Sequence, residues 1–480
     1  MQTIKRNYIL QLCYQVLNML LPFVTSPYIS RVLGAENLGI YSYTFSIANL
    51  FMLFINLGIE KYGTRAIAIR KNNKNELEQT FSELLFLKCI IGVFVTLTYF
   101  GAVVLIFDYK IYFVIQGALL ISSILDINWF FFGIEQFKIT VTRNFIFKIT
   151  SVILVFLFVK TKEDLVIYCI IMSLGTALSQ TAVWSVLRKY IRIKRVSLCQ
   201  IASHLKPLII LFVAILAQSA YTYIDKIMIG TLSSMNNLGF CENAYKVIAF
   251  PMGVITSFGM VMLPRMSILF ENDSSLADLY LQKSMYIISI LSIGMAAGMF
   301  GIGEDFAVLF WGQSFATSGT IIKIIAPMVV FMAMADVLRN QLLIPKARDK
   351  DYTIAVIVGA MVNLLSNYLL IPRYESYGAA IGSVISYFFI LVYQIIATRK
   401  ELHYISFFID MLPYSINATL MVLVLRFVSI AINNHLSWFT LLIKILVGVV
   451  VYCALSIIWL IIKKDPLLKM INRENSRSRN

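Results

Sequence analysis

The chain has 480 residues, of which 59% are hydrophobic and 14% charged, and its mean hydropathy is +0.80. Soluble domains carry about 25% charged residues, so the composition excludes a soluble globular protein. The net charge of +16 could suggest a nucleic-acid partner, but the positions of the charges along the chain indicate otherwise.

Apolar stretches long enough to cross a bilayer fill the chain almost from end to end. A spanning helix needs about 20 mainly apolar residues, and the runs lack the alternation of barrel strands. The sequence therefore predicts an all-α polytopic membrane protein with about 14 transmembrane helices. The weakest span is 145–160, which is short and carries Lys148. The predicted spans are 8–31, 38–60, 81–107, 111–133, 145–160, 165–187, 208–231, 240–263, 284–303, 318–344, 353–371, 378–398, 406–430 and 437–462.

Lysine and arginine concentrate in alternate connections between these spans. The side that holds the N-terminus carries 30 of the 41 basic residues, the other side carries 6, and 5 lie inside spans. This positive-inside pattern predicts that both termini are cytoplasmic. The excess of basic residues is then explained by the orientation of the chain in the membrane and by contact with anionic lipid headgroups, and it does not indicate a nucleic-acid partner.

The motifs of common enzymes and metal sites are missing from the sequence. There is no phosphate-binding P-loop and no His/Cys spacing typical of a metal site. No polar connection is long enough to hold a catalytic domain. The sequence therefore predicts a transporter rather than an enzyme, with no cofactor and no metal.

Two segments 200 residues apart resemble each other. Asn37-Leu38-Gly39 recurs as Asn237-Leu238-Gly239, and Arg65 recurs as Arg265. Chance could produce so few matches, but they open and follow spans 2 and 8, which must insert in the same orientation. We therefore expect two six-helix lobes in parallel pseudo-twofold repeat. The expected domains are an N-terminal lobe (1–199), a C-terminal lobe (200–400), and two extra helices with a basic cytoplasmic tail (401–480).

Four cations inside or at the ends of spans are candidates for binding an anionic group. Charged residues within a membrane are costly and are usually paired or functional. Lysine and arginine bind phosphates well, so we hypothesise that these four hold a diphosphate. The alternative is local pairing with neighbouring acids such as Asp225 and Glu242. The four candidates are Arg31, Lys88, Lys226 and Lys246.

The end of the fourth span combines an acid with aromatic side chains. Asp126, Trp129 and Phe130 would share one face of a continuous helix. A carboxylate beside an indole can bind a sugar, so we expect sugar contacts here. The alternative is an interfacial aromatic belt. Asp126 and Asp225 are also the candidates for carrying a coupling ion, H⁺ or Na⁺.

Other charged residues in the spans have structural interpretations. Arg426 and Lys444 lie near the outer ends of the last two spans, which predicts that they snorkel to the interface. Asp336 and Arg339 are spaced to pair on one helix face. We therefore expect the last two spans to lie at the periphery.

The first span combines amides with prolines. Gln11, Gln15 and Asn18 form a polar stripe, and Pro22 and Pro27 follow. Because proline interrupts helix hydrogen bonds, we expect a bendable helix. Interhelical packing of the amides is the alternative.

Several of these segments together resemble a known family. The run from Leu33-Gly34 through Leu38–Thr44, followed by Leu57-Gly58, Tyr62-Gly63 and Arg65, resembles the N-terminal signature of bacterial Wzx-type polysaccharide repeat-unit flippases. The run Asp126–Phe137 resembles that family's fourth-span motif. Asp225-Lys226 with Gly230, and Pro264-Arg265, resemble its second-half motifs.

The resemblance implies the fold of the MOP (multidrug/oligosaccharidyl-lipid/polysaccharide) superfamily, which is MATE-like, with a cationic cavity between two lobes. The implied substrate is an undecaprenyl-diphosphate-linked oligosaccharide, moved by alternating access from the inner to the outer leaflet of the bacterial cytoplasmic membrane. The product would serve capsule, exopolysaccharide or O-antigen synthesis, with the polysaccharide polymerase and assembly machinery as partners. An ion gradient, not ATP, would drive the step.

Three alternatives remain open from the sequence. A flippase for a teichoic-acid or peptidoglycan lipid intermediate would need the same features. An ion-coupled MATE-type drug exporter is disfavoured because the candidate cavity residues are mainly basic. A membrane-embedded glycosyltransferase or polymerase is disfavoured by the short outer loops.

Overall fold

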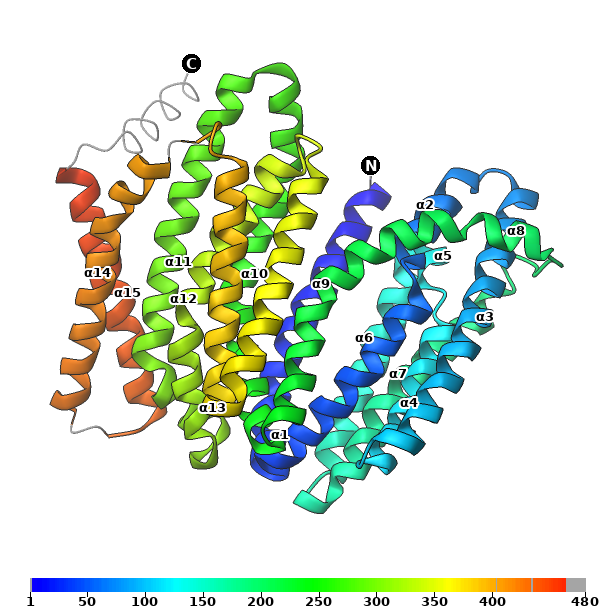
Figure 1. Ribbon diagram of the computed structural model, residues 1–480, viewed down its shortest axis with the longest axis horizontal. Coiled ribbons are helices and arrows are strands. Elements are labelled where there is room, and N and C mark those ends of the chain that lie inside the picture. The colour runs from blue at the N-terminus through cyan, green and yellow to red at the C-terminus, as the bar shows by residue number, and fades with distance from the viewer. Residues whose placement is uncertain (1, 403, 433–434, 463–480) are drawn as a thin grey trace. The chain divides into compact units, whose positions relative to one another are not determined.

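The computed structural model describes residues 2–402, 404–432 and 435–462, and within them every regular element is a helix. The chain forms two compact units, Met1–Gly239 and Phe240–Asn480 (Figure 1). The predicted all-α polytopic fold is confirmed. The expected lobe limits at 199/200 and 400/401 stay predictions.

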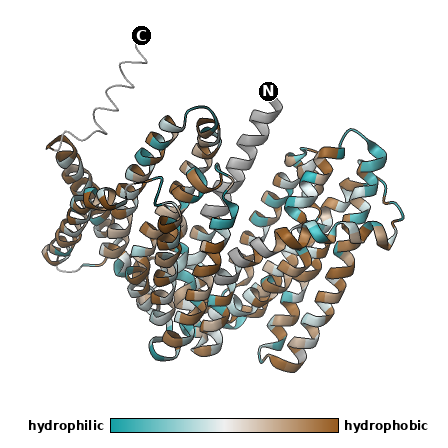
Figure 2. Ribbon diagram, turned by 45° about the horizontal axis from the view of Figure 1, so that its top comes forward, coloured by the Kyte–Doolittle hydropathy of each residue, from teal (hydrophilic) through white to brown (hydrophobic). Residues whose placement is uncertain are grey.

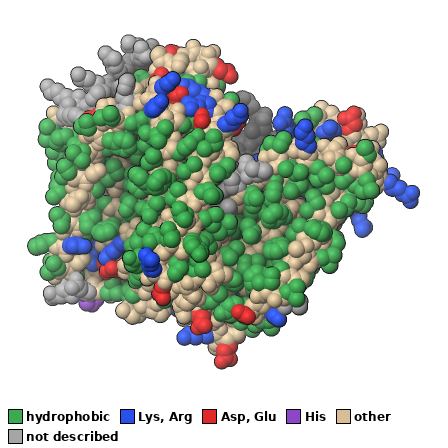
Figure 3. Space-filling model, viewed as in Figure 1, with side chains coloured by type: hydrophobic (Ala, Val, Ile, Leu, Met, Phe, Trp, Pro, Cys, Tyr) green, Lys and Arg blue, Asp and Glu red, His purple; other side chains and the backbone are tan. Residues whose placement is uncertain are grey.

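Among the described residues, eleven segments are long and apolar enough to cross a membrane. Two of them, Leu21–Arg70 and Asp349–Ala397, each cover two predicted spans across a bend. Helix α9 (Leu205–Leu232) covers the predicted span 208–231. The structure is thus consistent with fourteen spans. Apolar residues dominate the helices in Figure 2, and Figure 3 shows hydrophobic side chains covering most of the face in view.

The first unit is built from nine α-helices and one short 3₁₀ turn in the described residues. Helices α1 and α4 pack together, as do α4 and α7, while α9 packs against α1. The elements are α1 (Gln2–Asn56), α2 (Ile59–Arg70), α3 (Lys74–Ile106), α4 (Lys110–Leu125), α5 (Asn128–Gly133), α6 (Phe137–Phe158), η1 (Lys162–Asp164), α7 (Leu165–Leu187), α8 (Leu198–Ser203) and α9 (Leu205–Leu232).

The bend in α1 lies at a glycine and not at the prolines. Gly34 has φ 78° and ψ 176°, a conformation that only glycine adopts easily. Pro22 and Pro27 lie inside the helix before it. A second break follows at Gly58, whose φ of 77° separates α1 from α2. The polar stripe predicted at Gln11, Gln15 and Asn18 lies outside the described side chains.

The predicted fourth span is not one helix. Helix α4 ends at Leu125, Asp126 is extended, and α5 begins at Asn128. The expected common face of Asp126 and Trp129 is therefore wrong. The fifth span is also longer than predicted, because α6 begins at Phe137.

A reciprocal helix crossing follows the 200-residue offset of the repeated sequence. A Cβ on Gly39 would lie 1.8 Å from the carbonyl oxygen of Met235, and one on Gly239 would lie 2.0 Å from that of Ala35. Residues 35 and 235, like 39 and 239, are equivalent under the repeat. Both contacts lie within the first unit. The repeated glycines thus permit backbones to touch, which supports the offset read from the sequence.

The second unit begins within α10 and consists of long helices packed around α11 and α12. Helix α13 is bent at Glu375, where φ is 53°. The elements are α10 (Met235–Asn272), α11 (Ser274–Trp311), η2 (Gln313–Phe315), α12 (Ala316–Leu338), the π-helix η3 (Arg339–Leu343), α13 (Asp349–Ala397), α14 (Tyr404–Ala431) and α15 (Trp438–Ile462).

The last helix, α15, is held against α11 by two polar contacts. The ammonium of Lys444 pairs with Asp305, and Lys444 is only 5% exposed. The predicted snorkelling of Lys444 is therefore wrong, while Arg426 is exposed as expected. The hydroxyl of Tyr452 donates to the carbonyl of Ile290 at 2.7 Å. Helices α14 and α15 pack on α11 as part of the second unit.

Candidate functional site

A buried lysine closes the break between α4 and α5. Lys88 on α3 is 1% exposed, and its Nζ donates to the backbone carbonyl of Asp126 at 2.8 Å. The indole of Trp184 donates to the carbonyl of Leu125 at 2.8 Å. The carbonyls of Leu125 and Asp126, which lie at the break, are thus hydrogen-bonded, as buried backbone groups require. Asp126 and Glu60 supply the negative charges that act on Lys88.

This burial corrects the prediction for Lys88. An ammonium that is almost wholly covered and bonded to its own fold offers no surface to a diphosphate in this conformation. Removing the partner of a buried charge is costly, so the lysine and the α4–α5 break stabilise each other. The structure assigns Lys88 an architectural role.

The predicted sugar contacts at Trp129 and Phe130 are likewise corrected. The two side chains are 1% and 0% exposed and belong to the hydrophobic core of the first unit. Phe81 stacks on Trp129 with ring centroids 5.3 Å apart. Gly63 also packs against the indole of Trp129, because a Cβ added at Gly63 would lie 2.7 Å from the indole ring. In this conformation neither ring can stack on a sugar.

Arg143, which falls between the predicted spans 111–133 and 145–160, is a buried cation. It lies on α6, is 8% exposed, and its guanidinium donates to Asn128 and Gln180, each at 2.9 Å. It also donates to its neighbour Asn144. Arg143 therefore ties α6 to the start of α5 and to α7. The apolar pattern with helical spacing continues from residue 145 back to residue 137, and this pattern could have placed Arg143 within the helix.

Three other predicted site residues of the first unit are more exposed than Lys88, namely Arg31, Lys226 and Asp225. Arg31 is exposed on α1 three residues before the bend at Gly34. Lys226 and Asp225 are half-buried on α9, which packs against α1. Their predicted roles in holding a diphosphate and a coupling ion stay predictions.

Lys246 lies in the second unit, on α10, and has local partners. Its Nζ donates to Asn243 at 3.2 Å and lies 3.7 Å from the carboxylate of Glu242. The local pairing considered from the sequence is thus present. The convergence of Lys246 with Arg31 and Lys226 on one cleft stays a prediction.

The predicted pair on the tenth span is confirmed. Arg339 pairs with Asp336, and Asn340 donates to the same carboxylate at 3.0 Å. Gly259 on α10 leaves room for this cluster, since a Cβ there would lie 2.8 Å from Asp336 Oδ2. The cluster stands where α12 changes into the π-helix η3, a geometry frequent at functional sites.

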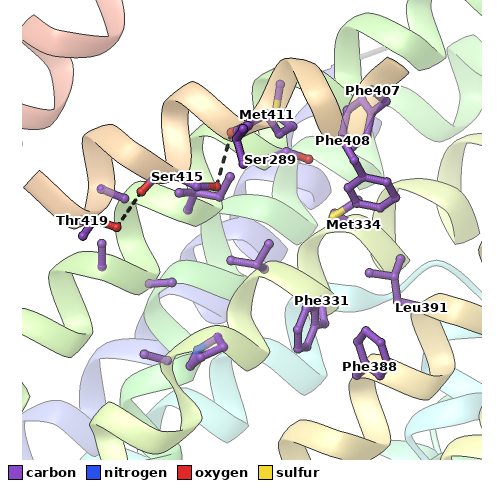
Figure 4. A pocket seen from close by; sticks show the side chains of 18 of the residues that line it. Ser289, Phe331, Met334, Phe388, Leu391, Phe407, Phe408, Met411, Ser415 and Thr419 are labelled. Atoms are coloured by element: carbon purple, nitrogen blue, oxygen red, sulfur yellow. Dashed lines mark hydrogen bonds between the residues drawn. The ribbon is translucent and has the colours of Figure 1, made fainter. Parts of the chain in front are cut away.

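A large apolar cavity lies within the second unit among α11, α12, α13 and α14 (Figure 4). Its volume is about 850 Å³. The hydroxyls of Ser415 and Thr419 donate to carbonyls of their own helix, so they offer the cavity little polarity. Exposed Phe408 and Leu412 line it as well, so it opens on the apolar surface. Such a cavity suits a hydrocarbon chain.

Comparisons with known proteins agree with this architecture. A family model described as polysaccharide biosynthesis protein matches residues 4–270. A candidate O-antigen transporter of Shigella dysenteriae is 26% identical over 403 residues, which cover 82% of this chain and 100% of that protein.

Two solved structures share the fold. The lipid II flippase MurJ in an inward closed conformation aligns with a TM-score of 0.77 at 16% identity, covering 95% of this chain and 100% of that one. An inward-facing MATE multidrug transporter of the MOP superfamily aligns with a TM-score of 0.63 at 13% identity, covering 84% of this chain and 94% of that one. At these identities the likeness concerns the fold alone.

The family model covers more than half of the chain, and the motifs that resemble Wzx-type flippases lie largely within it. The Shigella protein is named as a candidate transporter, and the two solved structures are those of a flippase and a transporter. The chain therefore belongs to the polysaccharide biosynthesis protein family and is a multi-pass membrane protein with the MOP-superfamily fold.

Proposed function

We propose that this protein moves an undecaprenyl-diphosphate-linked oligosaccharide repeat unit from the inner to the outer leaflet of the bacterial cytoplasmic membrane. Transport would proceed by alternating access, and the repeat unit would enter capsule, exopolysaccharide or O-antigen synthesis. Family membership over residues 4–270 is the observation that carries the proposal. The alignment with a candidate O-antigen transporter over that protein's whole length supports it further.

The substrate of such a step has an anionic head and a long hydrocarbon tail. Arg31 is exposed and Lys226 is half-buried on neighbouring helices of the first unit, so these cations are the best candidates to contact the diphosphate. Lys246 on α10 is a further candidate, and its ammonium also contacts Asn243 and Glu242. The apolar cavity of the second unit offers a place for part of the tail.

The remaining features of the proposal follow from orientation and chemistry. The basic connections favour cytoplasmic termini. The absence of a P-loop in the sequence favours coupling to H⁺ or Na⁺, for which Asp225 and Asp126 are candidate carriers. The polymerase and the assembly machinery that use the flipped repeat unit are the expected partners.

The proposal is tested in a strain that lacks this protein. Lipid-linked repeat units should accumulate in the inner leaflet, and the native chain should clear them. The Arg31→Ala, Lys226→Ala double variant should insert normally but fail to clear the lipid. A double variant at exposed cations, Lys350→Ala with Arg426→Ala, is the matched control and should work normally.

Other outcomes would identify the alternatives. Accumulation of a peptidoglycan or teichoic-acid lipid intermediate would assign the protein to that lipid instead. If no lipid-linked intermediate accumulates and the strain becomes sensitive to cationic drugs, a drug exporter is the better assignment. Full activity of the Arg31→Ala, Lys226→Ala variant would refute the diphosphate contacts.

A further inference from the structure

A groove separate from the cavity of Figure 4 runs between α11 and α15 in the second unit, and its volume is about 670 Å³. Asp305 on α11 pairs with Lys444 on α15. Ile290, earlier on α11, accepts a hydrogen bond from Tyr452, which lies later on α15. The two helices therefore run antiparallel along the groove. Val449 on the α15 wall is 58% exposed, so the groove opens on the apolar surface of the molecule.

Helix α11 lines this groove with two glycines that lie one turn apart. The ring of Tyr452 packs on Gly294, where an added Cβ would lie 2.5 Å from the ring. At Gly298, no atom of the described residues lies within 4 Å of an added Cβ. Small residues at this spacing commonly let helices pack closely. Here they bring α15 close at the first position and leave a hollow at the second.

The two ends of the groove differ in charge. At one end Lys444 is neutralised by Asp305. Lys283 lines the other end, and its ammonium lies 5.5 Å from the centroid of the Tyr280 ring. The guanidinium of Arg265 on α10 lies 4.3 Å from the same centroid, so the two cations are at most 9.8 Å apart. An aromatic ring attracts a cation without neutralising it, so the Lys283 end is basic.

The sequence after α15 adds positive charge next to that end. Because the helices are antiparallel, the last turn of α15 lies beside the Lys283 end, where Leu460 lines the groove. Residues 463–480 then contain six lysines and arginines but only two acids. Basic clusters that directly follow a spanning helix attract anionic lipid headgroups. The positive-inside pattern predicts that this end faces the cytoplasm.

The spacing between the basic end and the glycines matches one leaflet of a bilayer. Gly294 lies eleven residues after Lys283, which is about 16 Å along a helix axis. Half of the hydrocarbon core of a bilayer is about 15 Å thick. A hydrocarbon chain that begins beside Lys283 therefore reaches the middle of the membrane at Gly294, and the hollow at Gly298 accommodates its end.

We propose that the groove between α11 and α15 binds an anionic phospholipid of the cytoplasmic leaflet. Its phosphate lies beside Lys283 and Arg265, and one acyl chain runs along α11 past Gly294 and Gly298. The basic end and the basic sequence after α15 favour an anionic headgroup over a zwitterionic one, and the apolar groove favours a lipid over a free anion. The proposal does not depend on the proposed function, because such a lipid holds α15 against α11 whatever the protein transports.

Headgroup recognition is tested by native mass spectrometry of the full chain with phosphatidylglycerol and with phosphatidylcholine of the same acyl chains. We expect tighter binding of phosphatidylglycerol. Lys283→Ala should weaken that binding about fivefold, the effect of removing one cation near an anionic headgroup, and should leave phosphatidylcholine unaffected. Lys350→Ala, which removes an exposed cation outside the groove, is the control and should bind as the native chain does. Equal binding of the two lipids by the native chain, or native binding by Lys283→Ala, would overturn the proposal.

The position of the acyl chain is tested by filling the hollow. Gly298→Leu should weaken binding of long-chain phosphatidylglycerol and leave binding of a short-chain form unchanged. Gly101→Leu on α3, where no described atom lies within 4 Å of an added Cβ either, is the matched control and should bind both forms normally. If Gly298→Leu does not fold, Ile457→Trp fills the groove from its α15 wall instead.

Two results would overturn the assignment of the groove. One is native binding of long-chain phosphatidylglycerol by the variant with the filled groove. The other is displacement of phosphatidylglycerol from the native chain by undecaprenyl diphosphate at lower concentration than by phosphatidylglycerol itself, since the groove would then belong to a polyprenyl lipid. Failure of undecaprenyl diphosphate to displace the phospholipid supports the proposal.

Discussion

Replacing Gly39 with alanine should force α1 away from the start of α10. The added Cβ would lie 1.8 Å from the Met235 oxygen, whereas real Cβ contacts stay above 3.0 Å, so the crossing must open by 1.2 Å. Overpacking of this kind costs typically about 1–3 kcal/mol. Alanine has a higher helix propensity than glycine, which stabilises the helix by about 0.5–1 kcal/mol and offsets part of this cost. The net loss then lies between about 0 and 2.5 kcal/mol, and we expect the upper part of this range because the atom that the Cβ meets belongs to the backbone.

The assay is the melting temperature of the detergent-purified protein. Gly239→Ala, the equivalent change on the other copy of the repeat, should act with the same sign, because its Cβ would lie 2.0 Å from the Ala35 oxygen. The double variant Gly39→Ala, Gly239→Ala should lose less stability than the two single variants added together, because one separation of the helices relieves both contacts. Gly101→Ala is the control, because no atom lies within 4 Å of its Cβ. The reasoning is refuted if all three single variants melt alike.

Three further predictions concern other parts of the chain. Lys444→Ala should destabilise the protein by about 1–3 kcal/mol, because the half-buried Asp305 carboxylate loses its partner. Adding Asp305→Leu should recover most of the loss in thermal melting. Thr419→Trp should fill the apolar cavity and slow lipid clearance with little change in melting, whereas Ile416→Trp, outside the cavity lining, should not. Asp273→Ala should loosen the start of α11, measured by amide hydrogen exchange.

The effect at Asp273 has a defined pH dependence. Hydrogen bonds from the Ser275 hydroxyl and the Leu276 amide lower the pKa of the Asp273 carboxyl. A lowered folded-state pKa contributes stability that is present above the ordinary aspartate value and is lost as pH falls through the folded value. At neutral pH the amides at the start of α11 should therefore exchange more slowly in the native chain than in Asp273→Ala. In acid this difference should disappear, because the native Asp273 carboxylate becomes protonated. Equal exchange in both proteins at neutral pH would contradict this cap.

The controls for the cluster at Lys444 use the other cation of the last two helices. Arg426 is exposed, so Arg426→Ala should change the melting temperature little. If Lys444→Ala behaves like Arg426→Ala, the buried pair with Asp305 does not contribute as inferred.

Much of the fold could be predicted because each span is a local pattern. Apolar runs of the required length identify helices without knowledge of their neighbours. The repeated Asn-Leu-Gly segments indicated the 200-residue offset, but the crossing between their glycines was found only in the structure. The break at Asp126 escaped prediction because its stability depends on distant side chains. Lys88 lies 38 residues away and Trp184 lies 59 residues from Leu125, and each donates to a carbonyl that the break exposes.

The candidate site was harder to predict than the fold for the same reason. A lysine in an apolar run can snorkel, pair or bind a ligand, and the sequence does not show which. Lys444 finds its partner 139 residues earlier in the chain. Arg143 finds Gln180 and Asn128 on two other helices. Local pairs such as Asp336 with Arg339 were predicted correctly because their spacing alone brings them together.

The most direct test of the proposed function is the leaflet distribution of a lipid-linked oligosaccharide in liposomes that contain only this protein. The substrate is placed in one leaflet, and an enzyme that modifies only the accessible sugar reports its passage to the other. The account predicts rapid passage with the native chain and passage near the protein-free rate with the Arg31→Ala, Lys226→Ala variant. Passage by the native chain no faster than in protein-free liposomes, at any imposed ion gradient, would contradict it.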